Sequence, residues 1–71
     1  MDEFPLNGHP YIELYKLLKV TSVALSGGEA KVMISEGLVT VDGGVELRKR
    51  CKILSGQIIV CNGSTIMVTA S

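Results

Sequence analysis

Apolar side chains recur with a helical period between residues 10 and 20. The apolar side of this segment consists of Tyr11, Leu14 and Leu18, widened by Ile12, Tyr15 and Leu17. The opposite side carries Glu13, Lys16 and Lys19. Pro10 stands where a first helical residue tolerates proline, because that N–H would have no helical partner anyway. The pattern therefore predicts a short amphipathic helix over residues 10–20.

A second helix is predicted over residues 26–37, and both of its ends are marked. Ser26 is a good N-cap residue, and Glu29 three positions later completes a capping box. Gly37 is a typical C-terminal stop. The positions that recur at helical spacing and should face inward are Ala30, Met33 and Ile34.

After residue 37 the apolar period changes from helical to alternating, which is typical of strands. The predicted strands are "LVTV" (38–41), "VELRKRCKIL" (45–54), "QIIVC" (57–61) and "TIMVT" (65–69). The turn signals "DGG" and "NGS" indicate hairpins between them. In segment 45–54, one side is expected to carry Val45, Leu47, Cys51 and Ile53, and the other Glu46, Arg48, Arg50 and Lys52.

The order of these elements predicts an α+β fold. Residues 1–9 contain Pro5 and Gly8 and should form an extended lead-in. Two helices then precede the strands, so we expect them to pack on one side of a small antiparallel sheet. A chain of 71 residues suits one domain, here residues 1–71, and its 46% of hydrophobic residues can fill a small core.

Membrane insertion and secretion are not indicated. The first residues lack the basic and apolar regions of a signal peptide. Segment 53–71 is uncharged, but polar turn residues in its middle divide it into two strands. We expect a cytoplasmic protein without a membrane segment.

Residues for catalysis or metal binding are sparse. His9 is the only histidine, and it lies in a turn before a proline without a partner at catalytic spacing. Cys51 and Cys61 lack metal or redox spacing, so we expect reduced core or strand residues, with a disulfide or redox role as the alternative. Lys31 lies inside a predicted helix and not after a phosphate-binding glycine loop. The sequence predicts no enzyme, metal, cofactor or small-molecule substrate.

The net charge is zero, but the basic residues are concentrated. The basic run consists of Arg48, Lys49, Arg50 and Lys52. In a strand, the alternating residues Arg48, Arg50 and Lys52 would project from one face about 7 Å apart. This spacing resembles that of successive phosphates, and arginine binds phosphate oxygens through a bidentate fork. A charged edge strand that prevents edge pairing is the alternative.

Two adjacent glycines, Gly27 and Gly28, fall in the first turn of the second predicted helix. The first turn of a helix presents unpaired N–H groups and a partial positive charge. Without a Cβ to shield those groups, an anion can approach the backbone closely, and Lys31 adds a full charge one turn further on. The alternative is that the glycines only allow the preceding loop to pack tightly against the first helix.

The stretch "SGGEAKVMISEGLVTVDG" resembles the alpha-L motif of the RNA-binding domain first described in ribosomal small-subunit protein S-four. The matching positions are Ser26, Ala30, Lys31, Ile34, Gly37, Val39, Val41, Asp42 and Gly43. The continuation "VELRKRCKI" is similar to short, free-standing bacterial proteins of the YbcJ type, described as ribosome-associated and RNA-binding. Two departures are Gly27, where larger members carry a basic residue, and Gly56-Gln57, where the family often has Gly-Asp.

The resemblance implies a non-catalytic, ribosome-associated protein that binds ribosomal or other structured RNA. The RNA-binding residues that it implies here are Gly27, Gly28, Lys31, Arg48, Lys49, Arg50 and Lys52, with Lys16 and Lys19 at the margin. Tyr11 and Tyr15 are expected on the core face, which disfavours a protein that stacks single-stranded bases. The alternative function is a protein-interaction module that docks its basic face on an acidic protein partner.

Overall fold

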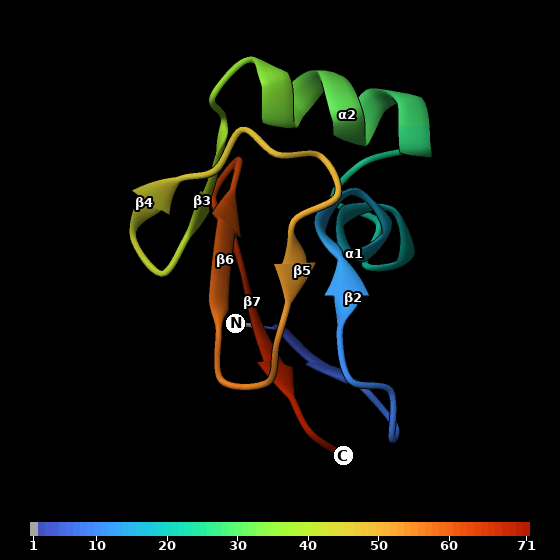
Figure 1. The fold of residues 1–71 in the computed structure, drawn as a ribbon. Helices are drawn as coiled ribbons and strands as arrows, with labels where there is room; N and C mark the ends of the chain where they lie inside the picture. The colour runs from blue at the N-terminus through green and yellow to red at the C-terminus, as the bar shows by residue number, and fades with distance from the viewer. Residues whose placement is uncertain (1) are drawn as a thin grey trace.

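The computed structural model describes residues 2–71, so Met1 of the predicted lead-in and domain lies outside the described residues. The elements in chain order are β1 (Asp2–Pro5), β2 (Ile12–Glu13), α1 (Leu14–Val20), α2 (Gly27–Ser35), β3 (Val39–Val41), β4 (Gly44–Val45), β5 (Lys52–Ile53), β6 (Ile58–Cys61) and β7 (Ser64–Thr69). One sheet has the order β1-β7-β6-β3-β4, and β2 pairs with β5 in a second, two-stranded sheet. Both helices lie at one end of the molecule, with α2 running across α1 (Figure 1).

The predicted class, two helices packed on a small sheet, is confirmed, but the sheet is mixed. β3, β4, β6 and β7 are antiparallel, as expected, whereas β1 runs parallel to β7 with Phe4 opposite Val68. The lead-in is extended, as predicted, and its strand β1 pairs with β7, the last strand of the chain. Its pairing continues beyond β1, because the N–H of Leu6 donates to the carbonyl of Thr69 at 2.8 Å, and the Leu6 side chain is buried.

The first helix begins at Leu14, four residues later than the periodicity predicts. Ile12 and Glu13 are extended and pair with Ile53 and Lys52 instead. Ile12 packs against the core in this extended conformation, and the helical pattern also places it on the apolar side, so the pattern alone does not distinguish the two conformations. Pairing with a strand that is distant in sequence decides the outcome.

The second helix and both hairpins form where their local signals place them. Ser26 Oγ accepts a hydrogen bond from the N–H of Glu29 at 3.1 Å, and the helix ends one residue before Glu36. The Glu29 carboxylate reaches back to the N–H of Leu25, at 3.4 Å, rather than to that of Ser26. In the hairpin turns, Asp42 and Asn62 have φ of 51° and each precedes a glycine with positive φ, which gives the twist that suits a tight hairpin.

The prediction of one long strand over residues 45–54 is wrong. The chain pairs only briefly at β4 and β5, and a turn closed by the N–H of Cys51 and the carbonyl of Arg48, at 3.2 Å, separates them. The chain leaves the main sheet after β4 in order to reach β2 and α1. As a result Val45 and Leu47, expected on the inner side, are exposed, whereas Ile53 is completely buried.

Apolar side chains from both helices and both sheets form one core. Its members are Leu6, Leu14, Leu17, Leu18, Ala24, Ala30, Met33, Ile34, Val39, Ile53, Ile59, Cys61, Ile66 and Val68. Cys51 and Cys61 are free thiols, and burial raises the pKa of both. Within residues 2–71, no helix combines the length and the apolar character needed to cross a bilayer.

Candidate functional site

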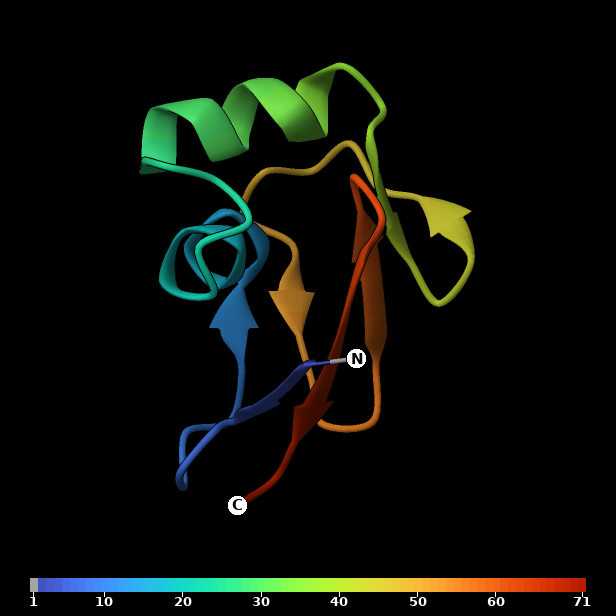
Figure 2. The same cartoon turned by 180° about the vertical axis from the view of Figure 1, so that it is seen from behind.

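The basic loop, which we define as residues 46–51 between β4 and β5, is fixed against the start of α1. It passes beneath α2 and reaches α1 in both views (Figures 1 and 2). The N–H of Leu14 donates to the carbonyl of Cys51 at 2.9 Å, and the N–H of Tyr15 donates to that of Lys49 at 3.1 Å. The first N–H groups of a helix lack intrahelical partners, and no side chain within the described residues 2–71 caps α1. The loop carbonyls satisfy them and thereby hold the loop in place.

Three cationic side chains from separate parts of the chain gather around the ring of Tyr15. Lys31 Nζ lies 4.8 Å from the ring centroid, and Lys16 Nζ and Arg50 Cζ each lie 6.0 Å from it. All three charged groups lie within 6.0 Å of the Tyr15 ring centroid, so any two of them are at most twice that distance apart. The quadrupole of an aromatic ring attracts cations. Tyr15 therefore organises a compact positive surface, which we call the Tyr15 basic surface.

Tyr11 contradicts the prediction that both tyrosines face the core. It is 39% exposed, and Lys52 Nζ lies 5.1 Å from its ring centroid. Tyr11 precedes Ile12 in an extended segment, so the two side chains point to opposite sides, and only Ile12 packs on the core. Tyr15 is half-buried and does pack on the core.

The predicted row of Arg48, Arg50 and Lys52 along one strand face is not formed, because the turn interrupts the strand. The three residues instead line one surface hollow together with Cys51. Lys49 is exposed in the same loop. Sequence spacing could not place Lys31 and Lys16 next to Arg50, since three separate elements must fold together to do so.

Arg48 is engaged by an acidic neighbour. Its Nε and Nη2 donate to the two carboxylate oxygens of Glu46 at 2.9 and 3.2 Å. These hydrogen bonds and the positive charge of Arg48 lower the pKa of Glu46 to about 2, and Glu46 raises the pKa of Arg48. Because the pKa of Glu46 is lower in the folded state than in the unfolded state, its ionised carboxylate stabilises the fold at pH values above the ordinary carboxyl pKa. This contribution is lost as the pH falls toward 2. At neutral pH the pair is fully ionised, and its charges cancel.

Lys16 forms a second ion pair on this side of the fold. Its Nζ lies 3.3 Å from Glu13 Oε1. Within residues 2–71, no carboxylate lies within ion-pair distance of Lys31, Arg50 or Lys52. Lys19 is exposed one turn further along α1, and none of the cation–ring contacts within residues 2–71 involves it. The uncompensated charge is therefore concentrated near Tyr15 and Tyr11.

The first turn of α2 lies beside this surface and is open to solvent. Gly28 and Ser26 are exposed, and Gly27 lies next to the Tyr15 ring. A Cβ on Gly27 would sit 3.7 Å from the ring, and one on Gly28 would meet only Ser26 Oγ at 3.8 Å. Both are ordinary contact distances, so packing does not require glycine at either position.

Comparisons with known proteins agree with this arrangement. A sequence profile of the S4 domain family matches residues 4–69. The chain is 49% identical over 70 residues to "Putative RNA-binding protein YbcJ" of Escherichia coli K12, and the match covers 99% of this chain and 100% of that protein. The same values hold for "Uncharacterized protein YbcJ" of Shigella flexneri.

The fold agrees with a solved structure as well. The solution structure of E. coli YbcJ, described as revealing an alpha-L motif involved in RNA binding, matches with a TM-score of 0.77 and 48% sequence identity. The match covers 99% of this chain and 89% of that one. The resemblance inferred from the motif residues is confirmed.

Proposed function

The chain belongs to the S4 domain family, and we propose that it is a non-catalytic protein that binds structured RNA through the Tyr15 basic surface. The observation that carries the proposal is the gathering of Lys16, Lys31 and Arg50 around one ring beside an open helix N-terminus. Ribosomal RNA in the cytoplasm is the target that we propose. The two relatives and the solved neighbour are not described as enzymes.

Phosphate is the group that this surface suits. Lys31 and Arg50 supply charge without a carboxylate partner in residues 2–71, and the first turn of α2 supplies N–H donors and a positive dipole end. Arginine adds a planar fork that matches two phosphate oxygens. These features contact the backbone of a nucleic acid and carry little information about base sequence.

A-form RNA is the form of nucleic acid that we propose. Its deep, narrow major groove excludes side chains, so recognition depends mainly on phosphates, 2′-hydroxyl groups and shape. The ring of Tyr15 is surrounded by cations and packed on the core, which leaves it poorly suited to stack on a base. We therefore expect affinity to depend on duplex geometry more than on sequence.

Salt dependence tests the proposal. Lys16 and Arg48 are already paired with Glu13 and Glu46. Four other basic residues lie in or beside the proposed surface: Lys31, Lys49, Arg50 and Lys52. If these residues release about four counterions from duplex RNA, the logarithm of the association constant should fall with the logarithm of the salt concentration, with a slope of about −3 to −4. Fluorescence anisotropy titrations at salt concentrations from about 50 to about 300 mM measure this slope. A slope near zero would contradict phosphate binding.

Gly28→Ala tests the contribution of the helix N-terminus. The new methyl group fits without a clash, so it should stabilise α2 by roughly 0.5–1 kcal/mol. It also adds bulk to the first turn of α2, where a phosphate would approach the backbone N–H groups, and should weaken duplex RNA binding about threefold to tenfold, which corresponds to roughly 1 kcal/mol. Thermal melts and anisotropy titrations measure the two effects.

Val32→Ala is the matched control, because Val32 is exposed in the middle of α2, away from its first turn. It should leave RNA affinity unchanged. If Gly28→Ala binds RNA as tightly as the unaltered protein, the helix N-terminus does not contact phosphate.

Docking of the basic face on an acidic protein is the competing explanation. A pull-down from cell extract with and without ribonuclease separates the two. Under the RNA proposal, ribosomal RNA is recovered and the associated proteins are released by ribonuclease. Protein partners that stay bound after complete RNA digestion would favour the competing explanation.

A further inference from the structure

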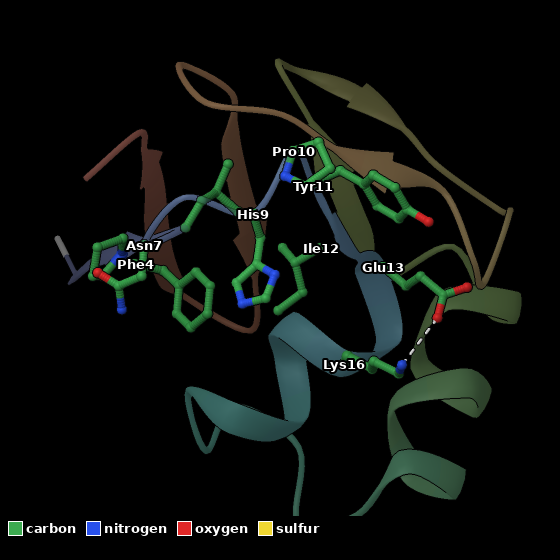
Figure 3. A pocket seen from close by; sticks show the side chains of 10 residues that line it. Phe4, Asn7, His9, Pro10, Tyr11, Ile12, Glu13 and Lys16 are labelled. Carbon is green, nitrogen blue, oxygen red and sulfur yellow. Dashed lines mark ion pairs between the residues drawn. The ribbon is translucent and has the colours of Figure 1, made fainter.

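A second concave surface lies beside the Tyr15 basic surface. We call it the N-terminal pocket; it is lined by residues 4–7, 9–13 and Lys16, and its volume is about 580 Å³ (Figure 3). Ligand pockets typically span about 300–1,000 Å³, so the hollow is large enough for one nucleotide. A tight turn at Asn7 and Gly8, both with positive φ, returns the chain and brings His9 to the pocket.

The walls of the pocket suit a flat ring with polar edges. Phe4 and Ile12 are partly buried and pack on the core, so they form a firm apolar base. Figure 3 shows the His9 imidazole between Phe4 and Ile12, and the Tyr11 ring near the Pro10 end. Aromatic and apolar walls of this kind accept a nucleobase by stacking, which is tolerant of base identity.

The charges of the pocket favour a neutral group. Its charged lining residues are Glu13 and Lys16, and these are paired with each other at 3.3 Å. The pocket interior therefore offers no net charge for a phosphate, while Asn7 and His9 offer donors and acceptors for the edge of a base.

Lys16 joins the pocket to the basic surface. The same side chain lines the pocket and has its Nζ 6.0 Å from the Tyr15 centroid. An RNA strand held at Tyr15 therefore passes within one side-chain length of the pocket. We propose that the N-terminal pocket receives an unpaired nucleobase that projects from a duplex bound on the Tyr15 basic surface. This inference rests on the proposed function and adds a preference for duplexes with a bulged nucleotide.

Three RNA hairpins test the inference: one fully paired, one with a single bulged adenosine, and one with an abasic bulge at the same place. We expect the bulged adenosine to be bound about tenfold more tightly than the other two, because one stacked base contributes an effect of this order. The abasic hairpin separates stacking from the added flexibility of a bulge.

Two variants assign the effect to the pocket. His9→Ala removes an exposed ring, and Phe4→Leu keeps apolar volume while it removes the aromatic face. Each should reduce the preference for the bulged adenosine to threefold or less and leave affinity for the paired hairpin unchanged. Val60→Ala, at an exposed position outside the pocket lining, should keep the full preference.

The outcomes distinguish the two proposals. Normal binding of the paired hairpin without a preference for the adenosine bulge over the abasic bulge would overturn the pocket alone. A preference that survives in both His9→Ala and Phe4→Leu would do the same. Failure of the unaltered protein to bind any of the three hairpins would overturn the proposed function as well.

Discussion

Combined replacement of Lys31 and Arg50 by alanine is expected to weaken duplex RNA binding by about 30-fold to 100-fold at low salt. Both side chains lie at the Tyr15 ring, and within residues 2–71 neither has a carboxylate partner. Each charge-assisted contact to a phosphate is worth about 1–1.5 kcal/mol or more, and two such losses correspond to the predicted change. Anisotropy titrations with a fully paired hairpin measure it.

The fold should tolerate this double replacement. Loss of exposed cation–ring contacts costs about 1 kcal/mol, which lowers the melting temperature of a domain of this size by several degrees. Lys19→Ala removes a charge from α1 that does not reach the ring and should change affinity less than threefold. Combined Glu46→Ala and Arg48→Ala replacement should also have a smaller effect than Arg50→Ala, because it removes both charges of an ion pair and leaves the net charge of the surface unchanged. Wild-type affinity in the double variant would show that RNA is bound elsewhere.

Ile53→Ala is expected to produce the largest loss of stability among single replacements near the site. Ile53 is fully buried and anchors β5 to β2 directly after the basic residues. Truncation of a buried isoleucine costs about 2–5 kcal/mol, and a small domain has only about 5–15 kcal/mol in total. The melting temperature should fall by on the order of 10–25 °C, measured by circular dichroism.

Leu54→Ala is the matched control, since Leu54 is the next residue, is also aliphatic, and is 51% exposed. It should change the unfolding free energy by less than about 0.5 kcal/mol. Similar losses for the two variants would contradict the placement of Ile53 in the core.

Local signals in the sequence were sufficient for α2 and the hairpins. The capping box at Ser26 and the glycine at position 37 act through the nearest residues, and so do the turns at Asp42 and Asn62. No distant part of the fold has to be known for such elements. The alpha-L part of the family resemblance, residues 26–43, rests on this same locally determined region.

Segments whose structure depends on distant partners were predicted less well. The alternation in 45–54 is compatible with one long strand, but the fold uses its middle as a loop that caps α1. The helical period from residue 10 likewise predicts a helix at Ile12, but Ile12 pairs with Ile53 and is extended. The contacts of Tyr15 have the same origin, because two of its three cations, Lys31 and Arg50, reach the ring from outside α1 only after the chain has folded.

Amide chemical-shift mapping by NMR is the most direct test of the central claim that RNA binds at the Tyr15 basic surface. Titration of the isotope-labelled protein with a paired RNA hairpin should perturb the amides of Gly27, Gly28 and Lys31 and those of residues 48–52. The exposed strand β4 and the turn at Asn62 should change little. Perturbations confined to β4 or to the far edge of the sheet, with unchanged signals at Gly28 and Arg50, would contradict the account.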